Sequence, residues 1–153
     1  VSEAQRDRAL QMVMQAQEQG ATIATGGRKP NIPGAFLAPT ILPDVTPDMT
    51  IAQEEVFAPV QSVLKFSSDD AAIQIANGTP YGLVGGVFTQ NLDRATHAAR
   101  QIRAGQVFVN EWYAGGVETP FGGYGKSGYG REKGREALWN YVQTKNVAIR
   151  LRG

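Results

Sequence analysis

The sequence contains no cysteine, and this absence removes several kinds of site from consideration. Without thiols the chain can form neither a disulfide framework nor a thiolate metal site, and it has no cysteine nucleophile. An excess of one charge is also missing, because 15 basic and 14 acidic residues give a net charge of +1. This balance gives no electrostatic reason to expect a nucleic acid or a membrane surface as partner.

Long apolar runs are absent as well. No stretch approaches the ~20 apolar residues of a membrane-spanning helix, and residues 1–6 do not begin like a signal peptide. We therefore expect a soluble, cytoplasmic protein. A chain of 153 residues has the length of one domain and can bury a substantial core. Val1 is not an initiator methionine, so the natural start can lie upstream.

Hydrophobic spacing and turn residues predict helices that alternate with short strands. Helices are expected over 3–19, from 67–70 to 76, from Asn91 or Asp93 to 104, and over 131–141. Extended segments are expected over 21–25, 36–42, 60–66, 83–89, 106–110 and 147–152. The segments at 83–89 and 106–110 are apolar nearly throughout, as is typical of strands buried on both faces. The alternation predicts an α/β fold with a mostly parallel sheet and flanking helices.

The first predicted helix has recognisable signals at both ends. Ser2 and Gln5 fit a capping box, in which the two side chains satisfy backbone N–H groups at the helix start. Gly20 suits the position that follows a helix C-terminus. Helical spacing places five apolar side chains toward the core: Ala4, Leu10, Val13, Met14 and Ala16.

Residues 53–60, with the sequence QEEVFAPV, are the stretch that most suggests a ligand. Pro59 lacks a backbone donor and restrains the preceding residue, so this backbone is expected to be irregular. If Glu54 or Glu55 points inward, its two oxygens can accept hydrogen bonds from vicinal hydroxyls such as those of a ribose. Phe57 can then lie against a flat ring attached to that sugar. The alternative is that both carboxylates are solvated and Phe57 belongs to the core.

Residues 110–130 are dominated by glycine and aromatic residues and show no periodicity. Loops of this length inside a compact domain are usually functional, and this one follows a predicted parallel strand, where α/β sheets place ligands. Gly123–Gly128 matches G-x-G-x-x-G, but it lacks the strand directly before it and the helix at its third glycine that a phosphate-binding loop needs. Packing glycines are therefore the favoured interpretation.

Two charged or titratable residues have simple interpretations. His97, the single histidine, has no partner at metal-ligand or catalytic spacing and is expected at the surface. Glu132 stands between Arg131 and Lys133 and is most simply an ion-pairing residue at a helix start.

Four separated segments, taken together, resemble the C-terminal third of the aldehyde dehydrogenase superfamily. Residues 54–60 resemble the family's E-E-x-F-G-P-V signature, and residues 75–83 resemble its I-A-N-x-x-x-Y-G-L run. Residues 120–134 resemble its late glycine-rich loop, and residues 144–147 its final strand. The resemblance divides the chain into residues 1–141, the C-terminal part of the catalytic domain, and residues 142–153, a terminal strand and oligomerisation tail.

The resemblance implies NAD- or NADP-dependent oxidation of an aldehyde to a carboxylic acid. In the family a cysteine thiolate attacks the aldehyde, hydride passes to the cofactor, and a glutamate activates the water that hydrolyses the thioester. Both groups are expected upstream, so the chain itself has no catalytic residue and is expected to be inactive alone. The implied partners are the aldehyde substrate, the N-terminal remainder of the enzyme, and further copies in a homo-oligomer.

The resemblance also implies roles for residues of this chain. Glu55 would hold the nicotinamide ribose hydroxyls and Phe57 would pack against the nicotinamide. The aldehyde pocket would be lined by Trp112, Ala114, Gly115 and Phe121, and Glu132 would belong to a polar relay. No metal site is implied.

The chain departs from the family pattern at two places that concern the site. Ala58 replaces a usual glycine, which would be strained if that position needed a positive φ. Gly115 replaces a residue that is bulky in many relatives, so a roomier pocket is expected. One competing hypothesis is a non-catalytic assembly or binding module that retains the fold. Another is a protein that binds a nucleotide through the loop at 123–128.

Overall fold

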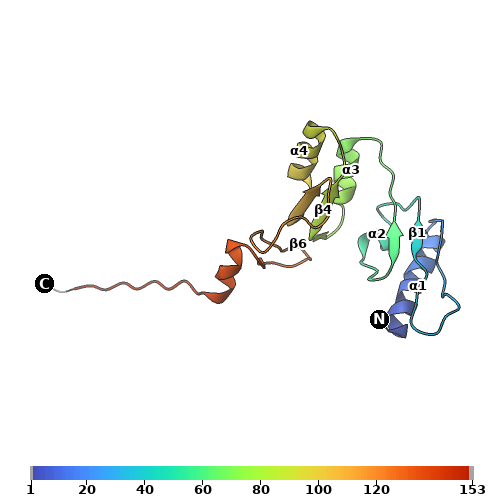
Figure 1. Ribbon diagram of the computed structural model, residues 1–153, viewed down its shortest axis with the longest axis horizontal. Helices are drawn as coiled ribbons and strands as arrows, with labels where there is room; N and C mark the ends of the chain where they lie inside the picture. Colours follow the sequence, from blue (N-terminus) through green and yellow to red (C-terminus); the bar gives the residue numbers. More distant parts are fainter. Residues whose placement is uncertain (1, 152–153) are drawn as a thin grey trace. The chain divides into compact units, whose positions relative to one another are not determined.

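The computed structural model describes residues 2–151. The chain divides into two compact units, and the boundary between them in the sequence lies between Pro80 and Tyr81. Each unit contains helices and one pair of parallel strands (Figure 1). The α/β class expected from the sequence is therefore confirmed. The strands form three separate two-stranded sheets among the described residues.

The first unit contains three helices and two strands among its described residues: α1 (Glu3–Glu18), β1 (Thr40–Leu42), α2 (Thr50–Gln53), β2 (Val60–Ser62) and α3 (Asp69–Ala76). β1 and β2 run parallel, with Thr40 opposite Val60 and Leu42 opposite Ser62. The run predicted at 21–25 forms a single bridge, from Thr25 to Ile41.

The core of the first unit lies between α1 and the strand pair. Val13 and Ala16 of α1 are buried in one cluster with Leu42 of β1 and with the segment that leads into α2. The predicted inward positions Ala4 and Met14 are wrong: both are exposed, and Met14 retains 60% of its surface. The face that packs on the sheet follows the spacing i, i+3, i+4, i+7 from Ala9, and Ala4 and Met14 lie off that stripe.

The second unit contains four strands, one α-helix and a 3-10 helix among its described residues: β3 (Tyr81–Gly82), β4 (Val84–Val87), α4 (Leu92–Gln101), β5 (Gln106–Val109), β6 (Tyr124–Gly125) and η1 (Arg135–Tyr141). β4, α4 and β5 form a βαβ unit whose strands pair in parallel, with Val84 opposite Gln106 and Val87 opposite Val109 (Figure 1). α4 packs on this pair through Ala95 and Ala98. β3 and β6 pair antiparallel.

Three expectations for the second unit are corrected. β4 is not buried on both faces, because a two-stranded sheet with one covering helix leaves its strands partly open. The last helix is a 3-10 helix that begins at Arg135 rather than Arg131. Residues 142–151 form neither helix nor strand and are exposed, since no described segment pairs with them; the predicted strand's last residue, Arg152, lies outside the described residues.

Candidate functional site

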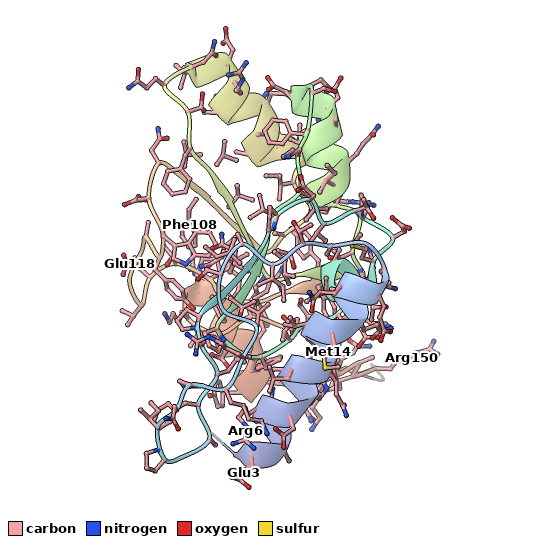
Figure 2. The ribbon with its side chains drawn as sticks, turned by 90° about the vertical axis from the view of Figure 1, so that its right-hand side faces the viewer. Glu3, Arg6, Met14, Phe108, Glu118 and Arg150 are labelled. Atoms are coloured by element: carbon pink, nitrogen blue, oxygen red, sulfur yellow. The ribbon has the colours of Figure 1, made fainter. Side chains whose placement is uncertain are left out.

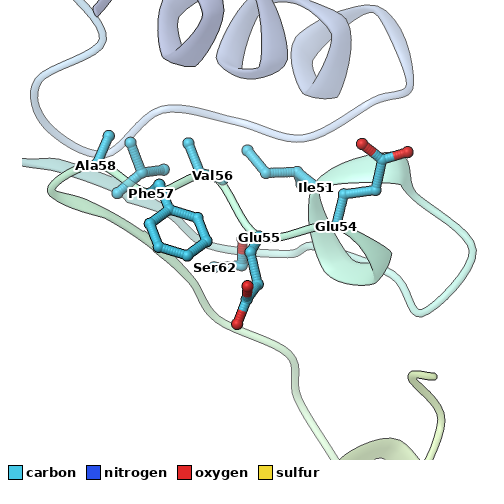
Figure 3. A pocket seen from close by; sticks show the side chains of 8 residues that line it. Ile51, Glu54, Glu55, Val56, Phe57, Ala58 and Ser62 are labelled. Carbon is cyan, nitrogen blue, oxygen red and sulfur yellow. The ribbon is translucent and has the colours of Figure 1, made fainter. Parts of the chain in front are cut away.

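The loop that follows α2 separates its two carboxylates. Glu54 is the C-cap of α2, and its side chain points away from that of Glu55, which lies on the same side as the Phe57 ring (Figure 3). Phe57 is 73% exposed, so the interpretation of Phe57 as a core residue is wrong. Both residues border an open depression of about 350 Å³ whose lining is completed by Ile51, Glu54, Val56, Ala58, Val60 and Ser62.

The backbone of this loop is unusual at Phe57. Its φ of 53° lies in the left-handed region, which aromatic residues rarely occupy. Such a conformation costs on the order of 1–3 kcal/mol and persists only where the surroundings impose it, which happens most often at ligand sites. Ala58 is not among the residues with positive φ, so the alanine that replaces the family's glycine is not strained.

Gln5 of α1 contacts this loop, a contact that the sequence analysis missed. Its Nε2 donates to the carbonyl oxygens of Val56 and Phe57, both at 3.1 Å. Only half of the predicted capping box forms. Ser2 Oγ accepts from the Gln5 N–H as predicted, but the Gln5 side chain donates to the loop carbonyls instead. No local pattern could have revealed this contact, since 51 residues separate Gln5 from Val56.

Ion pairs hold the N-terminal turns of α1 beside Gln5. Asp7 accepts from Arg6 Nε at 2.9 Å and pairs with Lys29 at 2.9 Å, and Arg6 also donates to the Gly34 carbonyl at 3.4 Å (Arg6 and Glu3 are labelled in Figure 2). The Arg6 hydrogen bond, followed by that from Lys29, lowers the pKa of Asp7 to about 2. The Arg6 side chain is only 10% exposed, so this end of the helix is tied to residues 28–34.

In the second unit, Trp112 is positioned by strand residues. Its ring lies against Gly86 of β4, where an added Cβ would stand 2.6 Å from a Trp112 ring carbon. The buried ring of Phe108 meets Trp112 edge-on at 5.9 Å, and it stacks with Tyr113 at 6.3 Å. Trp112 nevertheless remains 57% exposed and Tyr113 is exposed. The two outer rings therefore present aromatic surface while Phe108 anchors them.

The loop that carries Trp112 begins at a fixed turn. Asn110 has a φ of 59°, and its N–H donates to the Val87 carbonyl at 2.8 Å. The Asn110 side chain accepts from the Thr89 N–H and donates to the Thr89 carbonyl, both at 2.8 Å. These bonds join the ends of β4 and β5 and determine where the loop leaves the sheet.

The other predicted pocket residues lie further along the same loop. Ala114 is half-buried, Gly115 is exposed with a φ of 97°, and Phe121 is half-buried. No ring contact joins Trp112 to Phe121 in the part of the chain that the structure describes. Phe121 instead pairs with Glu132 through two backbone hydrogen bonds of 2.7 Å.

Glu132 is exposed, and its carboxylate forms no ion pair within residues 2–151. It also does not start a helix, since η1 begins three residues later, so the simple interpretation as an ion-pairing residue at a helix start is wrong. Its role in a polar relay stays a prediction. Glu55 and Phe57 belong to the first unit and the Trp112 loop to the second, so their union in one pocket also stays a prediction.

The segment 123–128 packs against neighbouring backbone. Ser127 Oγ accepts from the Gly82 N–H at 3.1 Å, and Gly123 is buried. Residues 124–125 form β6, and no helix opens at Gly128. Within the described residues there is no group of three side chains that could hold a metal ion, and no helix has the length and apolarity to cross a membrane.

Comparison with known proteins defines the family. The model of the aldehyde dehydrogenase family matches residues 1–147, and the chain therefore belongs to this family. It is 46% identical over 155 aligned residues to betaine aldehyde dehydrogenase of Brucella melitensis. Among solved structures, it is similar to the NAD+ complex of an aldehyde dehydrogenase from Bacillus cereus, with a TM-score of 0.92 and 43% identity over 99% of this chain.

A second solved structure is similar to the chain, and the chain spans only part of its relatives' length. A betaine aldehyde dehydrogenase from Staphylococcus aureus, solved with NAD+, has a TM-score of 0.86 and 38% identity over 90% of this chain. The chain spans about a third of the length of the relatives it matches: 32% of the Brucella protein and 31% of the Bacillus protein. The family is thus shared, whereas the cofactor chemistry and the activity of a complete enzyme are proposals for this chain.

Proposed function

We propose that this chain is the C-terminal part of an NAD-dependent aldehyde dehydrogenase. In it, Glu55 holds the hydroxyls of the nicotinamide ribose and Phe57 packs against the nicotinamide. Trp112, Ala114, Gly115 and Phe121 line the aldehyde pocket. NAD rather than NADP is the proposed cofactor because structural relatives from Bacillus cereus and Staphylococcus aureus were solved with NAD+.

The observation that carries this proposal is the exposed pair formed by Glu55 and Phe57. A carboxylate and a flat apolar ring lie side by side at an open depression (Figure 3). The backbone of Phe57 is left-handed, and this exposed residue does not pack in the core. This combination suits a group that joins vicinal hydroxyls to a flat heterocycle. The cofactor supplies the hydride acceptor when bound, while the chain's own residues bind, orient and exclude water.

The remaining roles follow from the same assignment. The nucleophile is provided by an upstream segment, since this chain contains no cysteine. The resemblance to the family implies that the base lies upstream as well. Residues 142–153 form the oligomerisation tail, whose exposed apolar side chains Val147, Ile149 and Leu151 alternate and can pair with a second copy. Glu132 belongs to the polar relay.

The test is a chimeric enzyme in which this chain replaces the matching third of the Bacillus cereus aldehyde dehydrogenase. We expect NAD-dependent aldehyde oxidation by the chimera and none by the 153-residue chain alone. A chimera that folds and oligomerises but neither binds NAD nor oxidises aldehydes would favour the non-catalytic assembly module instead. If the chimera is insoluble, co-expression of this chain with the upstream two-thirds of the Bacillus enzyme asks the same question.

A finer proposal concerns the substrate. The Brucella and Staphylococcus relatives are betaine aldehyde dehydrogenases, and quaternary ammonium groups bind well over aromatic rings such as the exposed Trp112 and Tyr113. We therefore expect the chimera to prefer betaine aldehyde over 3,3-dimethylbutanal, its neutral analogue of the same shape. Trp112→Ala should reduce that preference about tenfold, as the loss of a cation–π contact of roughly 1–2 kcal/mol predicts. An unchanged preference would exclude Trp112 from the pocket.

A further inference from the structure

We propose that Gln5 is the positioning residue of the loop that carries Glu55 and Phe57. Its carboxamide holds Phe57 in the left-handed conformation and thereby directs the ring toward the nicotinamide. The inference rests on the proposed function for the identity of the ligand. The clamp itself rests on the observed contacts between α1 and residues 56–57.

The two carbonyl groups that Gln5 binds are the ones on either side of the Phe57 Cα. The torsions between them are φ and ψ of Phe57, so binding both carbonyls restrains both torsions. In extended backbone, successive carbonyls point to opposite sides, whereas in helical conformations of either hand they point the same way. One NH₂ group reaches both carbonyls readily when Phe57 is helical in conformation, and its φ of 53° belongs to the left-handed form of that geometry.

Gln5 is well placed to impose such a conformation because its own backbone is fixed. The Gln5 N–H is capped by Ser2, and the next two residues, Arg6 and Asp7, are tied to the segment 28–34. α1 is anchored further along by the buried Val13 and Ala16. The loop's two carbonyls thus dock on a rigid helix end, which can offset the cost of a strained aromatic residue.

The Gln5 clamp differs from a helix cap in what it stabilises. A cap would bond the first N–H groups of α1, but the Gln5 side chain donates both of its hydrogens to the loop. Loss of these bonds should therefore change the loop more than the helix. This difference separates a positioning role from a merely structural one.

The experiment uses the chimeric enzyme with Gln5→Met, which keeps the length of the side chain and removes both donors. Gln11→Met is the matched control, because Gln11 lies on the same helix and its side chain is exposed. We expect Q5M to raise the KM for NAD about fivefold, with kcat changed less than twofold, and Q11M to leave both unchanged. If Q5M is insoluble, Gln5→Glu removes the donors at constant side-chain size.

Two further measurements decide the mechanism. In a crystal structure of the Q5M enzyme, φ of Phe57 should leave the region near 53°; retention of that conformation would overturn the proposal. In a double-mutant cycle, Q5M should add less than a twofold effect on the KM for NAD once Phe57 is alanine. If the effects of the two substitutions on the KM for NAD multiply instead, Gln5 acts by another route.

Failure of this inference is distinguishable from failure of the proposed function. If Phe57→Ala and Glu55→Gln raise the KM for NAD but Q5M behaves like Q11M, the function stands and the clamp is wrong. If neither F57A nor E55Q affects NAD, the proposed function fails, and the crystal structure of Q5M alone then decides whether the clamp exists.

Discussion

Gly105 lies directly against the backbone of Gly122: a Cβ atom added to Gly105 would stand 1.6 Å from the Gly122 carbonyl oxygen. This approach joins the residue before β5 to the loop that carries Phe121. The neighbouring Gln106 reinforces it by donating to the Pro120 carbonyl at 3.1 Å. A side chain at residue 105 would have to displace the loop, because the obstacle is backbone rather than a flexible side chain.

Gly105→Ala should therefore destabilise the chain by about 3 kcal/mol, at the upper end of overpacking costs. For a chain of this length, the corresponding fall in melting temperature is about 6–12 °C. Gly128→Ala is the control: it has a φ of 102° but no atom within 4 Å of the added Cβ, so only backbone strain of roughly 1–2 kcal/mol is expected. Thermal unfolding in which G105A lost no more stability than G128A would contradict the close packing.

Asn110 should be difficult to replace, because it combines a left-handed backbone with two hydrogen bonds to Thr89. Asn110→Ala loses both bonds and strains the backbone, so a loss of about 2–3 kcal/mol is expected. Asn110→Gly loses the same bonds without the strain and should recover about 1 kcal/mol of that loss. Equal unfolding free energies for the two variants in urea titrations would show that the backbone at residue 110 relaxes.

The ion pairs of Asp7 predict that the stability of the folded chain depends on pH in the acidic range. The pKa of Asp7 in the folded chain, about 2, lies below its ordinary value because Arg6 and then Lys29 bind the ionised form. Asp7 therefore contributes stability above about pH 4, and this contribution disappears as the pH falls toward 2. Asp7→Asn should have a lower melting temperature than the parent at pH 7.

The difference in melting temperature between the parent and D7N should become smaller as the pH falls from 4 to 2. Glu18→Gln provides the comparison, because Glu18 is an exposed carboxylate on the same helix and forms no ion pair within the described residues. A gap for D7N that stayed constant over this range would show that Asp7 acts through something other than its charge.

The sequence predicted local structure best where the signals are local. The caps Ser2, Ser68 and Asn91 were all at or within the predicted helix starts, and each side chain accepts the expected backbone hydrogen bond. Glu55 and Phe57 were likewise singled out by neighbouring residues, and they border the same depression. The left-handed backbone was suspected one residue too late, at Ala58, because the family pattern places a glycine there.

The features that could not be predicted depend on distant parts of the chain. The clamp by Gln5 joins residues that are far apart in sequence, and the close approach of Gly105 to Gly122 depends on how a loop returns to the sheet. The inward face of α1 was predicted only in part for the same reason: Val13 and Ala16 are buried, whereas Ala4 and Met14 are exposed because the strand pair selects which helical stripe is covered. Strand formation at 147–151 depends on a pairing partner that no described segment provides.

The most direct test of the account compares two adjacent carboxylates. Glu54 and Glu55 have the same charge and neighbouring positions, but their side chains point to different sides of the loop (Figure 3). In the chimeric enzyme, Glu55→Gln should raise the KM for NAD about tenfold, since a charged acceptor of ribose hydroxyls is lost, and Glu54→Gln should change it less than twofold. Equal effects of the two substitutions, or no effect of E55Q, would contradict the assignment of this loop to the cofactor.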